Sequence, residues 1–149
     1  MLWRGLSAYV NATAGKAYYT SSGLWVAGTP RDTEAIGLNY QTPKWNVAVF
    51  NKRVGQTWND NGAVNQASAN DPFDITNAYV NFTLNDGSHF QRTKLQLAMT
   101  NLTDSHAITS YTPGSKTSNL PNPNDVLQLL AGRSVSFTVT VGFSPRLVP

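Results

Sequence analysis

Apolar residues occupy every second position along several stretches of the chain, most clearly near its C-terminal end. Residues 133–143 read RSVSFTVTVGF, in which Val and Phe alternate with Ser, Thr and Gly. Alternate side chains of an extended strand point to opposite faces, so the pattern predicts one apolar face and one small, polar face. The apolar face carries no charge over about eleven residues, close to what a tilted strand needs to cross a bilayer. Either a protein core or lipid can cover such a face.

Five further segments alternate in the same way, and each predicts a strand. They are residues 6–14 with a continuation toward 19, residues 34–41, a strand that begins at Trp45, residues 74–84 and residues 92–103. The third strand loses its alternation after Phe50, where charges fall on both faces, which predicts a β-bulge or the emergence of the strand into water. All eight prolines lie outside the six predicted strands, as expected for a residue that cannot donate to a ladder.

The connections between these strands alternate between long and short. Residues 20–33, 57–73 and 104–132 are long connections, whereas residues 42–44 and 85–91 are short turns. This sorting predicts an all-β, antiparallel up-and-down meander with two unlike ends, as in outer-membrane barrels, and the Greek-key crossings of a soluble sandwich give no reason for it. Within the last connection, residues 125–131 (DVLQLLA) fit either a two-turn capped helix or an apolar loop plug.

Composition narrows the class of protein further. The 149 residues suit one structural unit, and only 13% are charged, whereas about a quarter is usual in soluble domains. The basic residues are scattered, which argues against a nucleic-acid partner. No run reaches the 18 apolar residues of a membrane helix and no signal peptide is recognisable, so any membrane crossing must use strands. Met1 runs almost directly into a strand pattern, which suggests a piece of a longer chain.

Chemistry-bearing residues are few and scattered. The chain has no cysteine, which excludes disulfides, thiolate metal sites and a cysteine nucleophile. His89 and His106 have no ligand-like spacing and are expected to be solvated loop residues. No serine has an arguable base, and the carboxylates do not pair on a strand face. The sequence therefore predicts neither an enzyme nor a bound cofactor or metal.

Four landmarks, taken in order, resemble the final strands of TonB-dependent outer-membrane receptors. They are GTPR at 28–31 before a strand that ends in Tyr40, DITNAYVNFTL at 74–84, NLTD at 101–104 and GRSVSFTVTVGF at 132–143. The resemblance covers nearly the whole chain, from about residue 6 to residue 143. This sequence departs from the family's pattern at Thr103, where an aromatic residue is usual, and in the residues 144–149 that follow Phe143.

The resemblance implies a barrel of about 22 strands plugged by an N-terminal domain, of which this chain holds the last six strands. The implied parent lies in the bacterial outer membrane and takes up a scarce ligand of the iron-siderophore, vitamin or glycan class. Its implied partners are outer-membrane lipid, the remaining barrel strands and plug, and the barrel assembly machinery. The inner-membrane TonB complex would act only through the plug, which is not part of this sequence.

The alternation and the resemblance together assign roles to individual residues. The positions expected to face lipid are Val80, Phe82, Leu95, Leu97, Val135 and Phe137. Tyr40 and Trp45 flank the first short turn and are expected in an aromatic girdle at the membrane interface, with ordinary edge packing as the alternative. The resemblance also implies that the last strand carries the signal for the barrel assembly machinery, in which alternate apolar residues end in an aromatic one. Here this signal maps onto Val139, Val141 and Phe143.

A second class of protein also fits the pattern. A soluble β-sandwich that binds carbohydrate would use Trp25, Trp58 and Tyr111 in the loops as stacking surfaces. It would explain the Asn and Thr content and the loop aromatics, but it leaves the sorted connection lengths unexplained.

Overall fold

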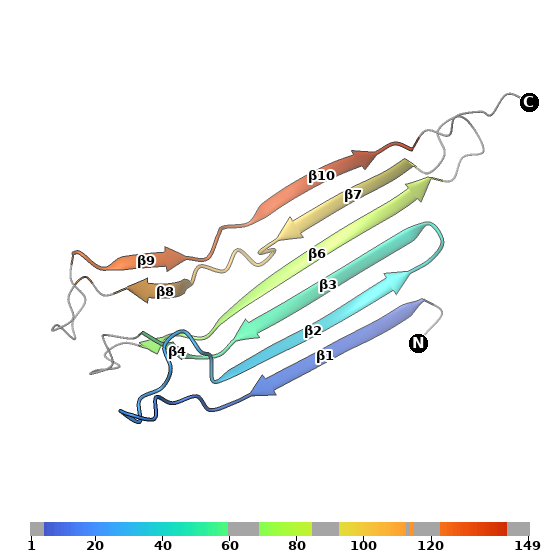
Figure 1. Ribbon diagram of the computed structural model, residues 1–149. Coiled ribbons are helices and arrows are strands. Elements are labelled where there is room, and N and C mark those ends of the chain that lie inside the picture. Colours follow the sequence, from blue (N-terminus) through green and yellow to red (C-terminus); the bar gives the residue numbers. More distant parts are fainter. Residues whose placement is uncertain (1–4, 60–68, 85–92, 113, 115–122, 143–149) are drawn as a thin grey trace, which may run out of the picture.

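The computed structural model describes residues 5–59, 69–84, 93–112, 114 and 123–142, and its main feature is one antiparallel sheet of six strands (Figure 1). The strands are β1 (Leu6–Ala14), β2 (Asp32–Gln41), β3 (Trp45–Val54), β6 (Phe73–Leu84), β7 (Thr93–Thr100) and β10 (Ser134–Thr140). Their order in the sheet is their order along the chain, without a crossover. The predicted all-β, antiparallel meander is therefore confirmed. The sheet is open, and β1 and β10 form its edges.

The two ends of this sheet differ, as Figure 1 shows. At the turn end, residues 42–44 join β2 to β3, and the hydroxyl of Thr42 accepts the Trp45 backbone N–H at 2.9 Å. At the loop end lie the described parts of the long connections, which are residues 15–31, 55–59 with 69–72, and 101–112 with 114 and 123–133. These connections contain two small sheets, one of β4 (Thr57–Trp58) with β5 (Ala69–Asn70) and one of β8 (Ile108–Thr112) with β9 (Val126–Leu129). The predicted turn at 85–91 lies outside the described residues.

Residues 125–131 form neither of the structures expected from the sequence. Val126–Leu129 is strand β9, paired antiparallel with β8. The carboxylate of Asp125, the first residue of the expected helix, accepts the Tyr111 hydroxyl at 2.6 Å and the Gly114 backbone N–H at 2.8 Å. The apolar side chains of β9 are exposed, so the segment is not a buried plug either.

Of the two explanations expected for the lost alternation in β3, the bulge is wrong, and the expected continuation of β1 toward residue 19 is wrong as well. β3 contains no bulge, because its register with β2 and β6 is continuous as far as Val54. β1 ends at Ala14 rather than near Tyr19, and beyond it Tyr18 makes only an isolated bridge to Trp25. The loss of alternation that begins after Phe50 therefore marks the end of the apolar band and not a defect in the ladder.

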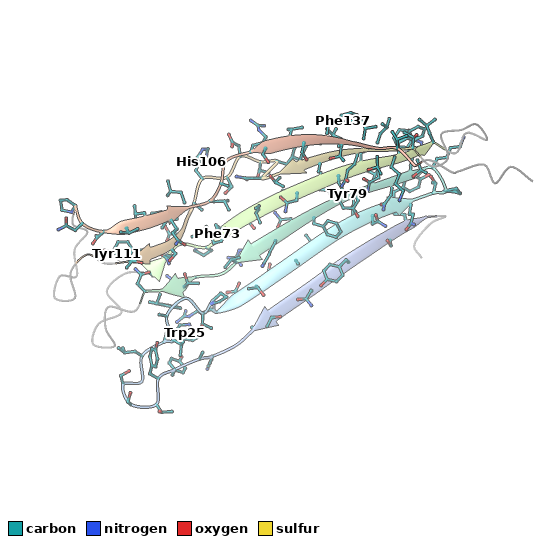
Figure 2. All side chains as sticks on the ribbon, turned by 45° about the horizontal axis from the view of Figure 1, so that its top comes forward. Trp25, Phe73, Tyr79, His106, Tyr111 and Phe137 are labelled. Atoms are coloured by element: carbon teal, nitrogen blue, oxygen red, sulfur yellow. The ribbon has the colours of Figure 1, made fainter. Side chains whose placement is uncertain are left out.

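The described residues contain little core. The buried hydrophobic residues among them are Trp25 and Ala48. Figure 2 shows side chains that project from both faces of a single layer of strands. In the part of the chain that the structure describes, no helix has the length and apolar character needed to cross a bilayer.

Candidate functional site: the apolar face of the sheet

The strand register sorts the side chains of the sheet into two faces, because residues paired across antiparallel strands lie on the same face. Val80 is opposite Val47 and Leu97, and Leu97 is opposite Phe137. The large side chains that share this face are Leu6, Val10, Ile36, Leu38, Tyr40, Trp45, Val47, Val49, Val80, Phe82, Leu84, Leu95, Leu97, Met99, Val135, Phe137 and Val139. We call this the apolar face. It runs across all six strands.

Much of the apolar face is open to solvent. Apart from Leu6, which is half-buried, the exposed fractions of its large residues on β1, β2, β3 and β10 run from 36% for Val47 to 72% for Val10. On strands β6 and β7, Val80, Phe82, Leu95 and Leu97 are half-buried by their neighbours in the sheet. Soluble monomers rarely leave a contiguous apolar patch of this extent uncovered. The six residues predicted to face lipid are therefore brought together on one continuous surface.

Aromatic rings mark the turn end of the apolar face. The rings of Trp45 and Phe82 lie on neighbouring strands with their centroids 4.4 Å apart. Tyr40 and Trp45 both lie on the apolar face, and each is 45% exposed. The structure thus brings Tyr40 and Trp45 to one end and one face, as the sequence pattern requires.

Charged and polar groups mark the loop end of the same face. Arg53 Nη1 lies 3.2 Å from Asp32 Oδ2 and 3.8 Å from Glu34 Oε1. One step nearer the apolar residues, Asn51 Nδ2 donates to Thr76 Oγ1 at 3.0 Å. The apolar face is thus an uncharged band between an aromatic rim and a polar rim.

The opposite face of the sheet, which we call the polar face, carries mostly amide and hydroxyl groups. One register line across it joins Gln41, Asn46, Asn81, Gln96 and Thr138. The buried side-chain oxygens of Asn39 and Asn46 have no hydrogen-bond partner among the described residues. Buried polar atoms of this kind are usually satisfied by water, so this face suits a wet environment.

The predicted assembly signal is only partly within the described residues. Val139 belongs to β10 and is opposite Leu95 on the apolar face. Val141 follows the end of β10. Phe143 lies outside the described residues.

The loop end contains a junction whose role the sequence did not reveal. Asn101 is 1% exposed, with φ at +49°, and its backbone N–H donates to Asn77 Oδ1 at 3.0 Å. Its side-chain amide donates to the carbonyls of Ser105 and Ala131, each at 2.9 Å, and its Oδ1 accepts the Ser105 N–H at 2.8 Å. We call this the Asn101 junction. The one feature of the sequence that indicates this junction is an asparagine directly after a strand. Asparagine tolerates a positive φ, and its side chain can form hydrogen bonds with nearby backbone groups.

Asp104 supports the junction from the other side of the turn. Its Oδ1 accepts the backbone N–H of Arg133 at 3.0 Å, and the guanidinium of Arg133 lies 3.8 Å from Oδ2. The backbone hydrogen bond, and then the nearby positive charge, lower the pKa of Asp104 below its ordinary value, although desolvation opposes this. The end of β7 and the start of β10 are thereby linked through side chains.

The three loop aromatics differ in accessibility. Trp25 is 5% exposed, donates from Nε1 to the Thr29 carbonyl at 2.7 Å and packs against Tyr18 and Trp58. It therefore offers no stacking surface. Trp58 and Tyr111, by contrast, line the same hollow at the loop end.

Metal-binding clusters are not formed by the residues that the structure describes. No group of three or more His, Asp or Glu side chains among them could hold a metal ion. His106 is exposed, and His89 lies outside the described residues. No protein-family model matches the chain, and no curated protein is significantly similar to it.

Proposed function

We propose that this chain is the C-terminal part of the transmembrane β-barrel of a TonB-dependent receptor in the bacterial outer membrane, with its apolar face toward lipid. The observation that carries the proposal is the uncharged apolar band, which crosses all six strands and ends in an aromatic rim on one side and a polar rim on the other. Lipid-facing barrel surfaces carry an apolar band flanked by girdles of aromatic residues, and the aromatic rim of this face matches one of these two girdles. The parent protein would take up a scarce ligand.

The band covers part of the height of a barrel's apolar belt. Strand β10 and the residue after it place apolar side chains from Val135 to Val141, which is about 20 Å along a strand at roughly 3.3 Å per residue. At a strand tilt of roughly 40° this corresponds to about 15 Å of height, whereas the apolar belt of outer-membrane barrels is about 25 Å tall. Tyr40 and Trp45, at one margin of the band, extend it with rings that are favoured at membrane interfaces.

The open edges and the polar face also fit a barrel. β1 and β10 each leave one row of backbone groups unpaired within the described sheet, and hydrocarbon does not tolerate unpaired backbone. Further strands of the parent receptor would pair with these edges. The amide-rich polar face would then line a wet interior and contact the plug.

A soluble β-sandwich is the second candidate. Its second sheet would cover the apolar face at a spacing of about 10 Å, and a six-stranded antiparallel sheet with one apolar side is a normal half of such a sandwich. The observation that favours it is the hollow between Trp58 and Tyr111, which suits a binding module. The sorted connection lengths favour the barrel.

Neighbouring cysteines on the two faces would separate these candidates, since the chain has no cysteine of its own. The proposed full-length parent receptor, in lipid vesicles, would carry Val80→Cys or Leu97→Cys on the apolar face, and Asn81→Cys or Gln96→Cys as matched controls on the polar face. Each would be labelled with an environment-sensitive dye and exposed to lipids brominated in the acyl chain. We expect quenching at positions 80 and 97 only. A shielded label at position 80 that brominated lipid does not quench would favour the sandwich.

A further inference from the structure

A hollow of about 330 Å³ lies where the three long connections meet at the loop end. The first connection contributes Ala27 and Gly28, the second contributes the β4–β5 hairpin, and the third contributes strand β8. Strands β5 and β8 are in contact, so the hollow joins segments that are far apart in the sequence. Ligand sites commonly have this volume and arise where several loops converge on a rigid sheet.

Buried polar side chains lie at the base of this hollow. Thr57 and Asn59 are 8% and 6% exposed, although both are polar. Asn70 Nδ2 donates to Thr57 Oγ1 at 3.0 Å and lies 3.4 Å from Asn59 Oδ1. These bonds hold the amide and hydroxyl groups in a fixed arrangement, which is how pockets set the orientation of a polar ligand.

Two aromatic residues line the hollow beside these groups, and each is held in place. The guanidinium of Arg31 lies 4.7 Å from the ring centre of Trp58, and the Trp58 carbonyl accepts the Gly28 N–H at 2.9 Å. The hydroxyl of Tyr111 donates to Asp125 at 2.6 Å. Thr109, Ser110 and Thr112 of β8 add hydroxyl groups to the same lining.

None of the described residues that line the hollow is charged. They are Ala27, Gly28, Thr57, Trp58, Asn59, Asn70, Thr109, Ser110, Tyr111 and Thr112. An anionic ligand, such as a ferric chelate, would lose its hydration here without gaining a charged donor from this lining. Hydroxyl and amide groups beside aromatic rings instead match a ligand that has many hydroxyl groups and an apolar ring face.

We propose that this hollow binds one unit of a neutral carbohydrate. Its hydroxyl groups would exchange hydrogen bonds with the Thr, Ser and Asn side chains, and its C–H face would contact Trp58 or Tyr111. The hollow lies at the loop end, so sugar binding there does not depend on whether lipid or a second sheet covers the apolar face. If the chain belongs to a transporter, as proposed above, neutral carbohydrates are the class of substrate that it takes up.

The test uses the full chain in lipid vesicles and three neutral trisaccharides, namely maltotriose, cellotriose and xylotriose, with ferric citrate as the anionic comparison. Saturation-transfer NMR would detect binding at concentrations up to about 10 mM, the weak end of specific affinity. We expect at least one trisaccharide to bind. Tyr111→Ala should weaken this binding about tenfold or more through loss of the ring contact, whereas Tyr111→Phe should keep it within about threefold.

Two further variants keep the test decisive if Tyr111→Ala disturbs strand β8. Asn70→Leu removes the amide at the base of the hollow with little change in size and should also weaken binding about tenfold. Tyr40→Ala, at the far end of the sheet, should leave binding unchanged. The proposal is overturned if no trisaccharide binds, if Tyr111→Ala and Asn70→Leu both bind normally, or if ferric citrate competes for the site. The bromolipid result at position 80 stands apart from all of these outcomes.

Discussion

The sheet and the loop end bury opposite kinds of residue. In the sheet, large apolar side chains on β1, β2, β3 and β10 remain exposed, and Ala48 is its buried hydrophobic residue among those described. At the loop end the buried residues are mostly polar, namely Thr57, Asn59 and Asn101, together with Trp25. A soluble domain normally shows the reverse, with apolar groups inside and polar groups outside.

The difference shows that the two regions are ordered by different forces. The sheet is ordered by its backbone ladder, and its apolar side chains still lack the cover that would make their burial favourable. The loop end is ordered by side-chain hydrogen bonds and ring contacts, such as those of Asn101 and Trp25. Substitutions in the sheet should therefore report on its surroundings, whereas substitutions at the loop end should report on the chain itself.

The largest expected effect tests the surroundings of the sheet. In the proposed full-length parent barrel in lipid vesicles, Val80→Arg should lower the free energy of unfolding by on the order of 2 to 4 kcal/mol, because a charge near the bilayer midplane must be taken out of water. Asn81→Arg, one residue away on the polar face, should be mild. Urea titration followed by circular dichroism measures both. Equal losses at the two positions would contradict a lipid-facing apolar face.

A slightly smaller effect is expected at the loop end. Asn101→Ala removes three side-chain hydrogen bonds, each worth about 1 kcal/mol net, and should cost about 2 to 3 kcal/mol with or without lipid. Asn39→Ala is the matched control, because the buried oxygen of Asn39 has no partner among the described residues. The same urea titration compares them. A larger loss for Asn39→Ala would mean that the junction contributes little.

A still smaller loss of stability is expected at Arg31, whose guanidinium lies beside the rings of Trp25 and Trp58 at the loop end. Arg31→Ala removes a guanidinium that lies 4.7 and 5.6 Å from the ring centres of Trp58 and Trp25, which is worth about 1 kcal/mol at an exposed site. The near-ultraviolet circular dichroism of the tryptophan pair should weaken. Arg53→Ala, which breaks exposed ion pairs in the sheet, should leave that signal unchanged.

The smallest effect is a dependence on pH at Asp104. Its pKa is lowered in the folded chain, chiefly by the Arg133 N–H, so the folded state binds this proton less readily than the unfolded state does. The stabilisation is therefore complete above the ordinary aspartate pKa of about 3.9 and is lost as the pH falls from there through the lowered value. Asp104→Asn should flatten this part of the stability profile. An unchanged profile below about pH 4 would show that other carboxylates dominate it.

The regular sheet was predictable from the sequence because its signal is local. Alternation along residues 6–14, for example, places the same side chains together wherever the strand lies, and the observed β1 has those bounds. Strand β9 was missed because a short apolar run such as residues 126–129 has no decisive period, and its strand conformation depends on pairing with β8. The same limit applies to β4 and β5, which are two residues each.

The loop end was less predictable because its contacts join distant residues. Asn101 was recognisable as part of a sequence landmark, but its bond to Ala131 spans 30 positions and leaves no periodic trace. Trp25 looked like an exposed loop aromatic, and only the packing of Tyr18 and Trp58 around it shows that it is buried. By contrast, the common face of Val80, Leu97 and Phe137 followed from alternation plus the antiparallel order of the strands.

The Asn101 junction has a consequence for how the chain can vary in length. Because Asn101 holds Ala131, and Asp104 holds Arg133, the residues that lead into β10 are fixed to the end of β7. The connection between Ser105 and Ala131, which contains β8 and β9, then has its two ends held together. Lengthening such a loop costs little chain entropy, about 0.6 kcal/mol for each doubling. We therefore expect insertions between Ser105 and Ala131 to leave the register of β10 against β7 unchanged.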